Sequence, residues 1–125
     1  MLSHKILMID AHPVYVNKTE GFLRGLTFHN ITIARNGKEG QEKAKSIRPD
    51  LIILSAMLPD MDSFDVCEAV KKSSPESRII VQVGLFYAAE EIERFMSLGA
   101  DRVLDRKEKD LQPLQDAIED LMVSP

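Results

Sequence analysis

The residues of this chain with the clearest chemical potential stand where short aliphatic segments end. They include carboxylates, an imidazole, a hydroxyl and a guanidinium. Together with the small or apolar residues at the same strand ends, they are Asp10, His12, Ser55, Met57, Val83, Gly84, Asp105 and Arg106. In a parallel α/β sheet the carboxyl ends of the strands meet at one edge, and ligands gather there. We therefore expect these side chains to share one edge of a sheet, where any site would be built.

Five aliphatic segments are expected to form that sheet. Lys5–Ile9, Leu51–Leu54 and Arg78–Val83 have no helical period, which is typical of strands buried on both faces. Ile31–Ala34 and Asp101–Leu104 are shorter segments of the same kind.

Apolar residues at helical spacing predict a helix after each of these strands. The first predicted helix begins near Pro13. The other four are predicted at Gly37–Ile47, Phe64–Lys72, Ala88–Met96 and Leu111–Leu121. Two glycines disfavour the second helix, although its apolar residues can face a core. In the fourth helix, the face expected to be buried comprises Ala88, Ile92, Phe95 and Met96. Strict alternation of strands and helices implies a parallel sheet with right-handed crossovers and helices on both faces.

Composition limits the classes of function. A length of 125 residues is that of one domain, so we expect residues 1–125 to form a single domain, either freestanding or as the N-terminal part of a longer protein. A net charge of −4 with scattered Lys and Arg gives no basic stripe for direct nucleic-acid binding. No segment approaches the roughly 18 apolar residues of a membrane span. The N-terminal segment lacks a signal-peptide pattern, so we expect a cytoplasmic protein.

The chain has one cysteine, Cys67, which excludes an internal disulfide and a zinc site built from cysteines. Its neighbours are largely apolar, and a buried cysteine behaves as a small hydrophobic residue. We expect a buried and unreactive thiol.

Three segments, taken in order, resemble the receiver domain of two-component response regulators. Lys5–Pro13 resembles the first strand and acidic turn of that family, and Pro49–Leu54 followed by Met57–Phe64 resembles its third strand and phosphoacceptor loop. Gly99–Leu104 resembles the lead-in to the fifth strand and the strand itself. The resemblance implies a flavodoxin-like (βα)5 fold, a doubly wound α/β sandwich whose five parallel strands are ordered 2-1-3-4-5.

The resemblance also implies an apparatus for phosphoryl transfer, from which this chain departs. The family places two adjacent acids after the first strand, whereas here Asp10 is followed by Ala11. Ser55 corresponds to the phosphoacceptor aspartate, and its neutral hydroxyl cannot form an acyl phosphate. The Ser or Thr that ends the fourth strand corresponds to Val83 or Gly84, and neither has a hydroxyl.

The fifth strand departs from the family as well. The lysine that follows it corresponds to Arg106, and the aromatic residue expected three positions earlier is Val103. Mg²⁺ in proteins is commonly bound by one or two carboxylates together with phosphate and water. Since Asp10 alone offers little charge, we expect weak or absent Mg²⁺ binding and no cofactor.

Four of these residues have alternative interpretations. Asp10 and Arg106 could line a remnant anion pocket, but we favour an ion pair that replaces the cation and fastens the first strand to the fifth, because an unpaired buried carboxylate is costly. Ser55 is expected to be a small residue that caps its strand rather than a target of a serine kinase. His12 is expected to be structural or solvated rather than a metal ligand or an acid–base group.

The leading hypothesis is an atypical receiver domain that acts in two-component or phosphorelay signalling as an interaction or regulatory module, and not as an enzyme. Its partner would be another protein, a fused output domain or a second copy. The resemblance places such contacts on the face formed by the predicted elements 88–96, 101–104 and 111–121. Residues expected to contribute to this surface are Phe86, Tyr87, Glu90 and Arg94.

Two other functions were considered. Asp10-Ala11-His12, Ser55 and Gly84 loosely resemble the Asp-x-His, Ser-x-Leu and Gly-Gly motifs of cobalamin-binding modules. However, three positions where those motifs need Gly, Leu and Gly are occupied by Tyr15, Met57 and Leu85. The other alternative is a receiver domain that retains an unorthodox phosphoryl transfer.

Overall fold

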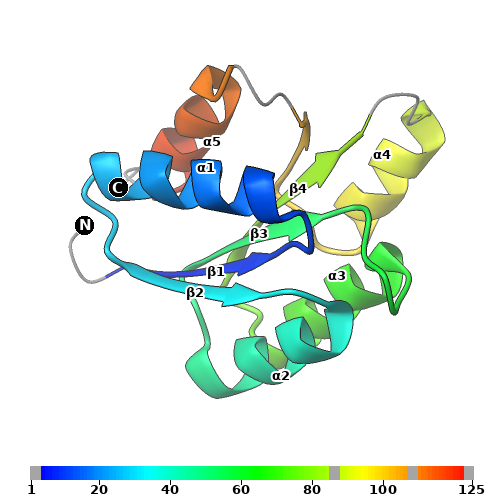
Figure 1. Cartoon of the computed structure of the whole chain (residues 1–125). Helices are drawn as coiled ribbons and strands as arrows, with labels where there is room; N and C mark the ends of the chain where they lie inside the picture. The colour runs from blue at the N-terminus through cyan, green and yellow to red at the C-terminus, as the bar shows by residue number, and fades with distance from the viewer. Residues whose placement is uncertain (1–3, 85–87, 107–109, 123–125) are drawn as a thin grey trace.

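The computed structural model describes residues 4–84, 88–106 and 110–122 (Figure 1). Within these residues, five strands alternate with five helices. In chain order they are β1 (Lys5–Ile9), α1 (Pro13–Gly25), β2 (Asn30–Ala34), α2 (Gly37–Ile47), β3 (Leu51–Ser55), α3 (Ser63–Ser73), β4 (Arg78–Val83), α4 (Ala89–Ser97), β5 (Arg102–Asp105) and α5 (Gln112–Met122). Each of the ten elements overlaps a segment predicted from the sequence, and the predicted ends coincide with the observed ones or differ by one residue.

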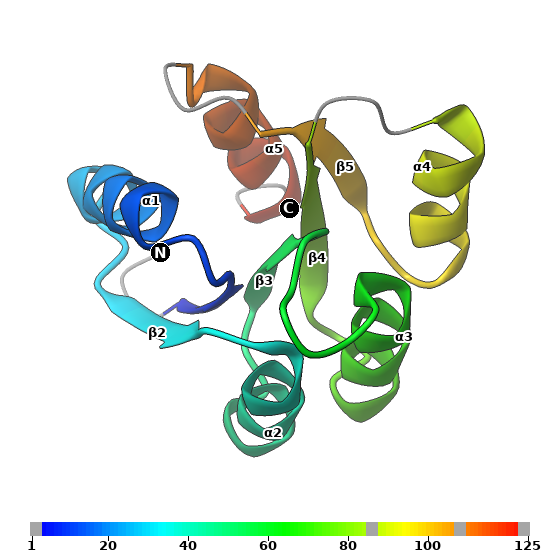
Figure 2. The ribbon, with the colours of Figure 1, turned by 45° about the vertical axis from the view of Figure 1, so that its right-hand side comes forward.

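The strands form one parallel sheet in the order β2-β1-β3-β4-β5. Helices α1 and α5 cover one face of this sheet, and α2, α3 and α4 lie on the other (Figures 1 and 2). The predicted doubly wound fold and strand order are therefore confirmed.

Each face of the sheet has its own core, because successive side chains of a strand point to opposite faces. Along β1, Ile6 and Met8 pack beneath α1 and α5, whereas Leu7 and Ile9 pack against the helices of the other face. This explains why the central strands are continuous runs of aliphatic residues rather than alternating ones.

Helix α2 lies so close to β1 that only glycine fits at position 40. A Cβ built on Gly40 would stand 2.7 Å from Cδ1 of the fully buried Ile9. Gly40 thus disfavours the helix by its conformational freedom but allows the helix to approach the sheet.

The first turn of α2 is capped from two directions. Asn36 accepts a hydrogen bond from the backbone N–H of Glu39 at 2.8 Å. The Asp60 carboxylate, from the loop before α3, accepts from the N–H of Gly37 at 2.7 Å and of Lys38 at 3.0 Å. These two bonds lower the pKa of Asp60 below its ordinary value. The loop that leads into α3 is therefore fixed to the start of α2.

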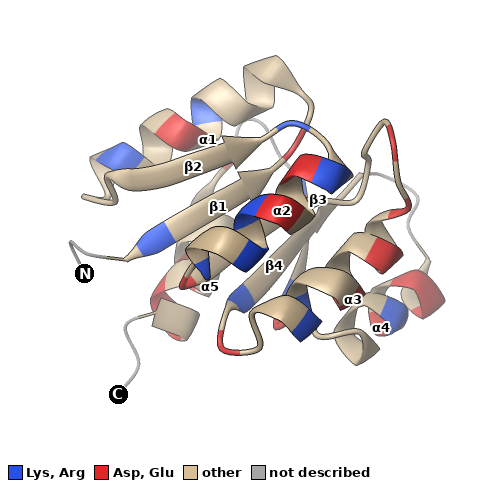
Figure 3. Ribbon diagram, turned by 90° about the horizontal axis from the view of Figure 1, so that it is seen from below, with Lys and Arg blue, Asp and Glu red and all other residues tan. Residues whose placement is uncertain are grey.

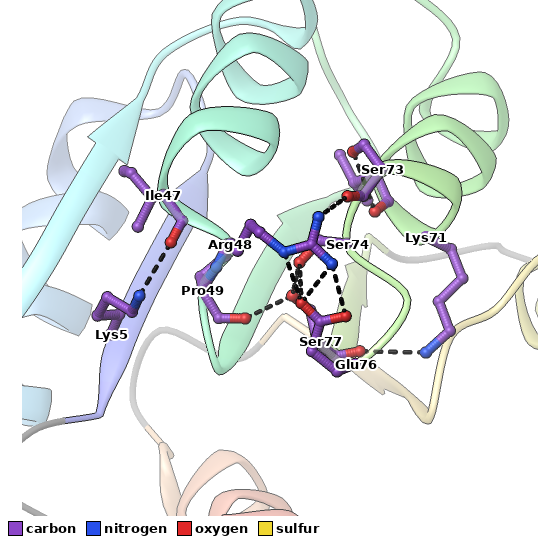
Figure 4. A network of polar contacts seen from close by, with 10 residues as sticks. Lys5, Ile47, Arg48, Pro49, Lys71, Ser73, Ser74, Glu76 and Ser77 are labelled. Carbon is purple, nitrogen blue, oxygen red and sulfur yellow. Dashed lines mark hydrogen bonds and ion pairs between the residues drawn. The ribbon is translucent and has the colours of Figure 1, made fainter.

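A second polar network lies at the amino ends of β3 and β4, the edge opposite the candidate site (Figure 4). Arg48 donates to both carboxylate oxygens of Glu76 at 3.0 and 2.9 Å. Beneath this pair the buried Ser77 hydroxyl donates to the carbonyl of Pro49 and lies 2.6 Å from the hydroxyl of Ser74. The network joins the end of α2 to the α3–β4 connection, and we assign it a structural role.

Two predictions about single side chains have different outcomes. Cys67 is fully buried, as expected, and burial raises the pKa of its thiol to about 11; that the thiol is unreactive stays a prediction. Met96 and Ala88 were expected on the buried face of the fourth helix, but Met96 is 45% exposed and Ala88 is exposed as well, so that prediction is wrong for both. In α4, Phe95 fills the core position next to Met96.

Among the described helices, none is long and apolar enough to cross a membrane.

Candidate functional site

Three polar side chains form a row across the carboxyl ends of β1, β3 and β4. Ile9 pairs with Leu54, so Asp10 and Ser55, which follow them, lie next to each other, and Ser55 in turn pairs with Gln82. By the alternation of the strands, all three point to the face covered by α1 and α5. Asp10, Ser55 and Gln82 are only 3%, 2% and 4% exposed. Groups so deeply buried need partners.

Asp10 obtains its partners from the β1–α1 turn and from the end of β5. One carboxylate oxygen accepts the backbone N–H of His12 at 3.0 Å, and the other accepts a hydrogen bond from the guanidinium of Arg106. The Arg106 side chain is 17% exposed and its backbone N–H bonds to the carbonyl of Val83. The ion pair thus spans the sheet from β1 to β5 at the edge where a ligand would bind.

Tyr15 of α1 holds the guanidinium from the other side. The Arg106 guanidinium carbon lies 4.2 Å from the centre of the Tyr15 ring, which is a cation–π contact. The Tyr15 hydroxyl accepts from the Gln82 side-chain amide at 2.5 Å. Burial raises the pKa of Tyr15, so the phenol is neutral at physiological pH. Asp10, Arg106, Tyr15 and Gln82 therefore form one connected cluster.

Ser55 takes part in a local turn rather than in this cluster. Its hydroxyl accepts the N–H of Met57 at 3.1 Å and donates to the Met57 carbonyl at 3.2 Å. The Ser63 hydroxyl donates to the Ser55 carbonyl at 2.9 Å. This arrangement is that of a short polar residue closing a turn after a strand.

The other positions singled out in the sequence also lie at this edge. Val83 ends β4 and its buried side chain packs in the core on the side of α3 and α4, while Gly84 follows it. A Cβ on Gly84 would approach the sulfur of Met57 to 4.0 Å. Ala11 and Val103 are half-buried, and Val103 packs against the same core as Val83.

His12 caps helix α1. Its Nδ1 accepts the backbone N–H of Tyr15 at 3.1 Å. A capping side chain satisfies an N–H that the helix itself cannot satisfy. This geometry is that of a structural histidine.

The residues expected to bind a partner are only partly described. Phe86 and Tyr87 lie outside the described residues. Glu90 is exposed, and the Arg94 guanidinium lies 4.1 Å above the ring of Phe64, which is itself stacked on Phe95 at 4.2 Å. Arg94 is therefore held against α3.

The donor set at this edge does not fit a divalent cation. Within residues 4–84, 88–106 and 110–122, no three His, Cys, Asp or Glu side chains are grouped as metal ligands. The single carboxylate of the row, Asp10, is occupied by Arg106 and by a backbone N–H. Mg²⁺ prefers several oxygen ligands in octahedral geometry, which this arrangement does not offer.

Comparison with known proteins identifies the family of the fold. The sequence model of the protein family described as the response regulator receiver domain matches residues 6–119 of this chain. This chain therefore belongs to the receiver domain family of response regulators, which decides against the cobalamin-binding alternative. Such domains are in general signalling modules.

Three similar proteins illustrate the match. The chain is 29% identical over 100 residues to the response regulator protein VraR of Staphylococcus saprophyticus, covering 78% of this chain and 46% of that protein. It is 27% identical over 118 residues to a gliding motility regulatory protein of Myxococcus xanthus, covering 94% of this chain and 15% of that protein. The crystal structure of a two-component response regulator from Clostridium difficile matches 97% of both chains with a TM-score of 0.88 and 25% identity. The chain thus spans less than half the length of these two curated relatives.

Sequence reasoning missed two members of the cluster, Gln82 and Tyr15. Tyr15 is a fully buried aromatic residue of α1, and its hydroxyl and ring also serve the site. Gln82 carried a signal, since it is the single polar residue in the aliphatic run Ile79–Val83. A polar residue inside a buried strand must find a buried partner.

Proposed function

We propose that this chain is an atypical receiver domain that signals through protein contacts and does not carry an aspartyl phosphate. The observation that supports this most strongly is the ion pair between Asp10 and Arg106. A guanidinium occupies the carboxylate that a cation would need, and it is held there by Tyr15. The substitutions at Ala11, Ser55 and Gly84 agree with the same interpretation.

In this proposal the positive charge of Arg106 replaces that of the bound cation. It neutralises the buried Asp10, and its planar guanidinium can bond to a carboxylate and stack on an aromatic ring at the same time, which a lysine ammonium does less well. The carboxyl edge of the sheet is then held in one arrangement without metal or phosphoryl group. Regulation would follow from binding of a partner, which shifts an equilibrium by its differential affinity for two states.

Incubation of the protein with acetyl phosphate and Mg²⁺, followed by intact-mass measurement, tests the proposal. We expect no added phosphoryl group on the wild type. A variant carrying Ala11→Asp, Ser55→Asp and Arg106→Lys, which restores the acids and lysine of the family, is the positive comparison. A stable phosphoryl adduct on the wild type would refute the proposal and favour unorthodox phosphoryl transfer.

We further propose that a partner, an output domain or a second copy binds the face formed by α4, β5 and α5. A hollow of about 340 Å³ opens there between Ile92, Val103 and Pro113, and its apolar lining supports such a contact. Ile92→Lys, a change in the lining of this hollow, should weaken that association by sedimentation or pull-down measurement. An unchanged association would exclude this face.

A further inference from the structure

A second apolar surface lies on the other side of α4, around Met57. The Met57 side chain is 68% exposed although it follows a fully buried strand. With Leu58 it lines two hollows, one of about 270 Å³ with Met61, Phe64 and Phe95, and one of about 430 Å³ with Ala11, Pro13 and Pro59. We call these residues, apart from the buried Phe95, the Met57 surface. Exposed apolar patches of this kind mark sites of association.

The Met57 surface is bordered by carboxylates on the side of α3 and α4. Asp62 lines the first hollow, and Asp65 stands in the first turn of α3. Glu90 and Glu91 stand in the first turn of α4. Figure 3 shows Asp and Glu positions in red on the loop before α3 and on α3 and α4. Helices that follow parallel strands begin at the carboxyl edge of the sheet, which brings the four side chains to the same edge as Met57.

The basic residues near this border do not cancel its charge. Among the described residues of this border, Arg94 lies 4.1 Å over the Phe64 ring, one turn beyond Glu90, and offers one positive charge against four negative ones. Arg106, which lines the second hollow, is neutralised by Asp10. The surface therefore combines an apolar centre with a negative rim on one side. Interfaces are built as such an apolar centre within a polar rim, and complementary charge steers the partner.

We infer that the Met57 surface binds a basic amphipathic helix of a partner protein, whose apolar side chains cover Met57 and whose Lys or Arg residues face Asp62, Asp65, Glu90 and Glu91. This inference rests on the proposed role as an interaction module and names the chemistry of one partner. A failure here would leave the phosphodonor result unchanged, so the two are separately testable.

The test uses the whole chain labelled with ¹³C at the methionine methyl groups and a short synthetic helix of leucine and lysine as the probe. On titration we expect the Met57 and Met61 signals to shift, while the signal of Met8, buried in β1, does not move. A helix with the same leucines and with glutamate in place of lysine should bind at least about tenfold more weakly, because its charge is reversed.

Variants separate a local site from attraction by net charge. Asp65→Lys combined with Glu90→Lys should weaken binding of the leucine–lysine helix by about tenfold or more. Glu42→Lys combined with Glu119→Lys makes the same change in net charge on α2 and α5, at positions that line neither hollow, and should weaken binding much less. The inference is overturned if both double variants weaken binding equally, if the glutamate helix binds as well, or if the Met57 signal does not move.

Discussion

At the scale of single residues, the site depends on a charge that is paired inside the protein. Asp10 is 3% exposed, and desolvation of a carboxylate is tolerated only if another charge compensates for it. Arg106 supplies that charge and is held in turn by Tyr15. The pair connects the first strand of the chain to the residue that follows the last strand.

Replacement of Arg106 therefore has a predictable cost. Arg106→Met leaves Asp10 buried and unpaired, and we expect the free energy of unfolding to fall by about 3–5 kcal/mol in urea denaturation. Asp10→Asn combined with Arg106→Met should cost less than the sum of the single changes, because the uncompensated charge is gone. Strict additivity of the two changes would mean that the side chains do not interact.

Cys67 gives a second prediction at this scale. Its pKa of about 11 and its burial mean that the thiolate that reacts with disulfide reagents is scarce in the folded protein. We expect the reaction with Ellman's reagent near neutral pH to be much slower than that of a free cysteine and to accelerate when urea unfolds the chain. Since the folded state keeps the proton, stability should fall as the pH rises above the ordinary value of 9.0. Rapid reaction of the native protein would contradict this.

At the scale of elements, the packing of α2 on β1 is the least tolerant contact. Gly40→Ala places a methyl group 2.7 Å from Ile9 Cδ1, and overpacking of this kind costs about 1–3 kcal/mol. Gly21→Ala in α1 meets nothing within 4 Å and should instead stabilise the protein by about 0.5–1 kcal/mol through helix propensity. Denaturant unfolding should therefore show a lower free energy of unfolding for Gly40→Ala and a higher one for Gly21→Ala. A stabilising effect of both would show that α2 can move away from β1.

The cap of α2 by Asp60 predicts a dependence on pH. The folded-state pKa of this carboxyl lies below its ordinary value of 3.8, so its contribution to stability is present above that value and is lost as the pH falls through the folded pKa. Asp60→Asn should lower the midpoint of thermal unfolding at neutral pH and make the loss on acidification smaller. Glu42→Gln, an exposed change on the same helix, is the control and should leave both unchanged.

The elements were predictable from the sequence because their pattern is local, whereas the site required contacts between distant residues. Aliphatic runs such as Leu51–Leu54 and helical spacing in α1 and α5 identified the sheet and its covering helices. The same reasoning wrongly turned Met96 inward, since periodicity alone does not say how wide the buried stripe of a short helix is. The link from Gln82 to Tyr15 joins β4 to α1, and nothing in local spacing predicts it.

At the scale of the whole molecule, the two hydrophobic cores on either side of the sheet hold the backbone in place. At the carboxyl edge of the sheet, contacts between side chains join the strands to one another. Receiver domains place their chemistry at this edge, and here the edge is closed by Arg106. We propose that the domain is a stable scaffold that signals through contacts on its surface.

The most direct test of this account is the response of unfolding to Mg²⁺. A ligand that binds only the folded state stabilises it by about 2.7 kcal/mol at a concentration of 100 times its Kd. Because Arg106 occupies Asp10, we predict that millimolar Mg²⁺ leaves the free energy of unfolding of the wild type unchanged, while the variant with Ala11→Asp, Ser55→Asp and Arg106→Lys is stabilised. A saturable stabilisation of the wild type by Mg²⁺ would contradict the replacement of the cation by Arg106.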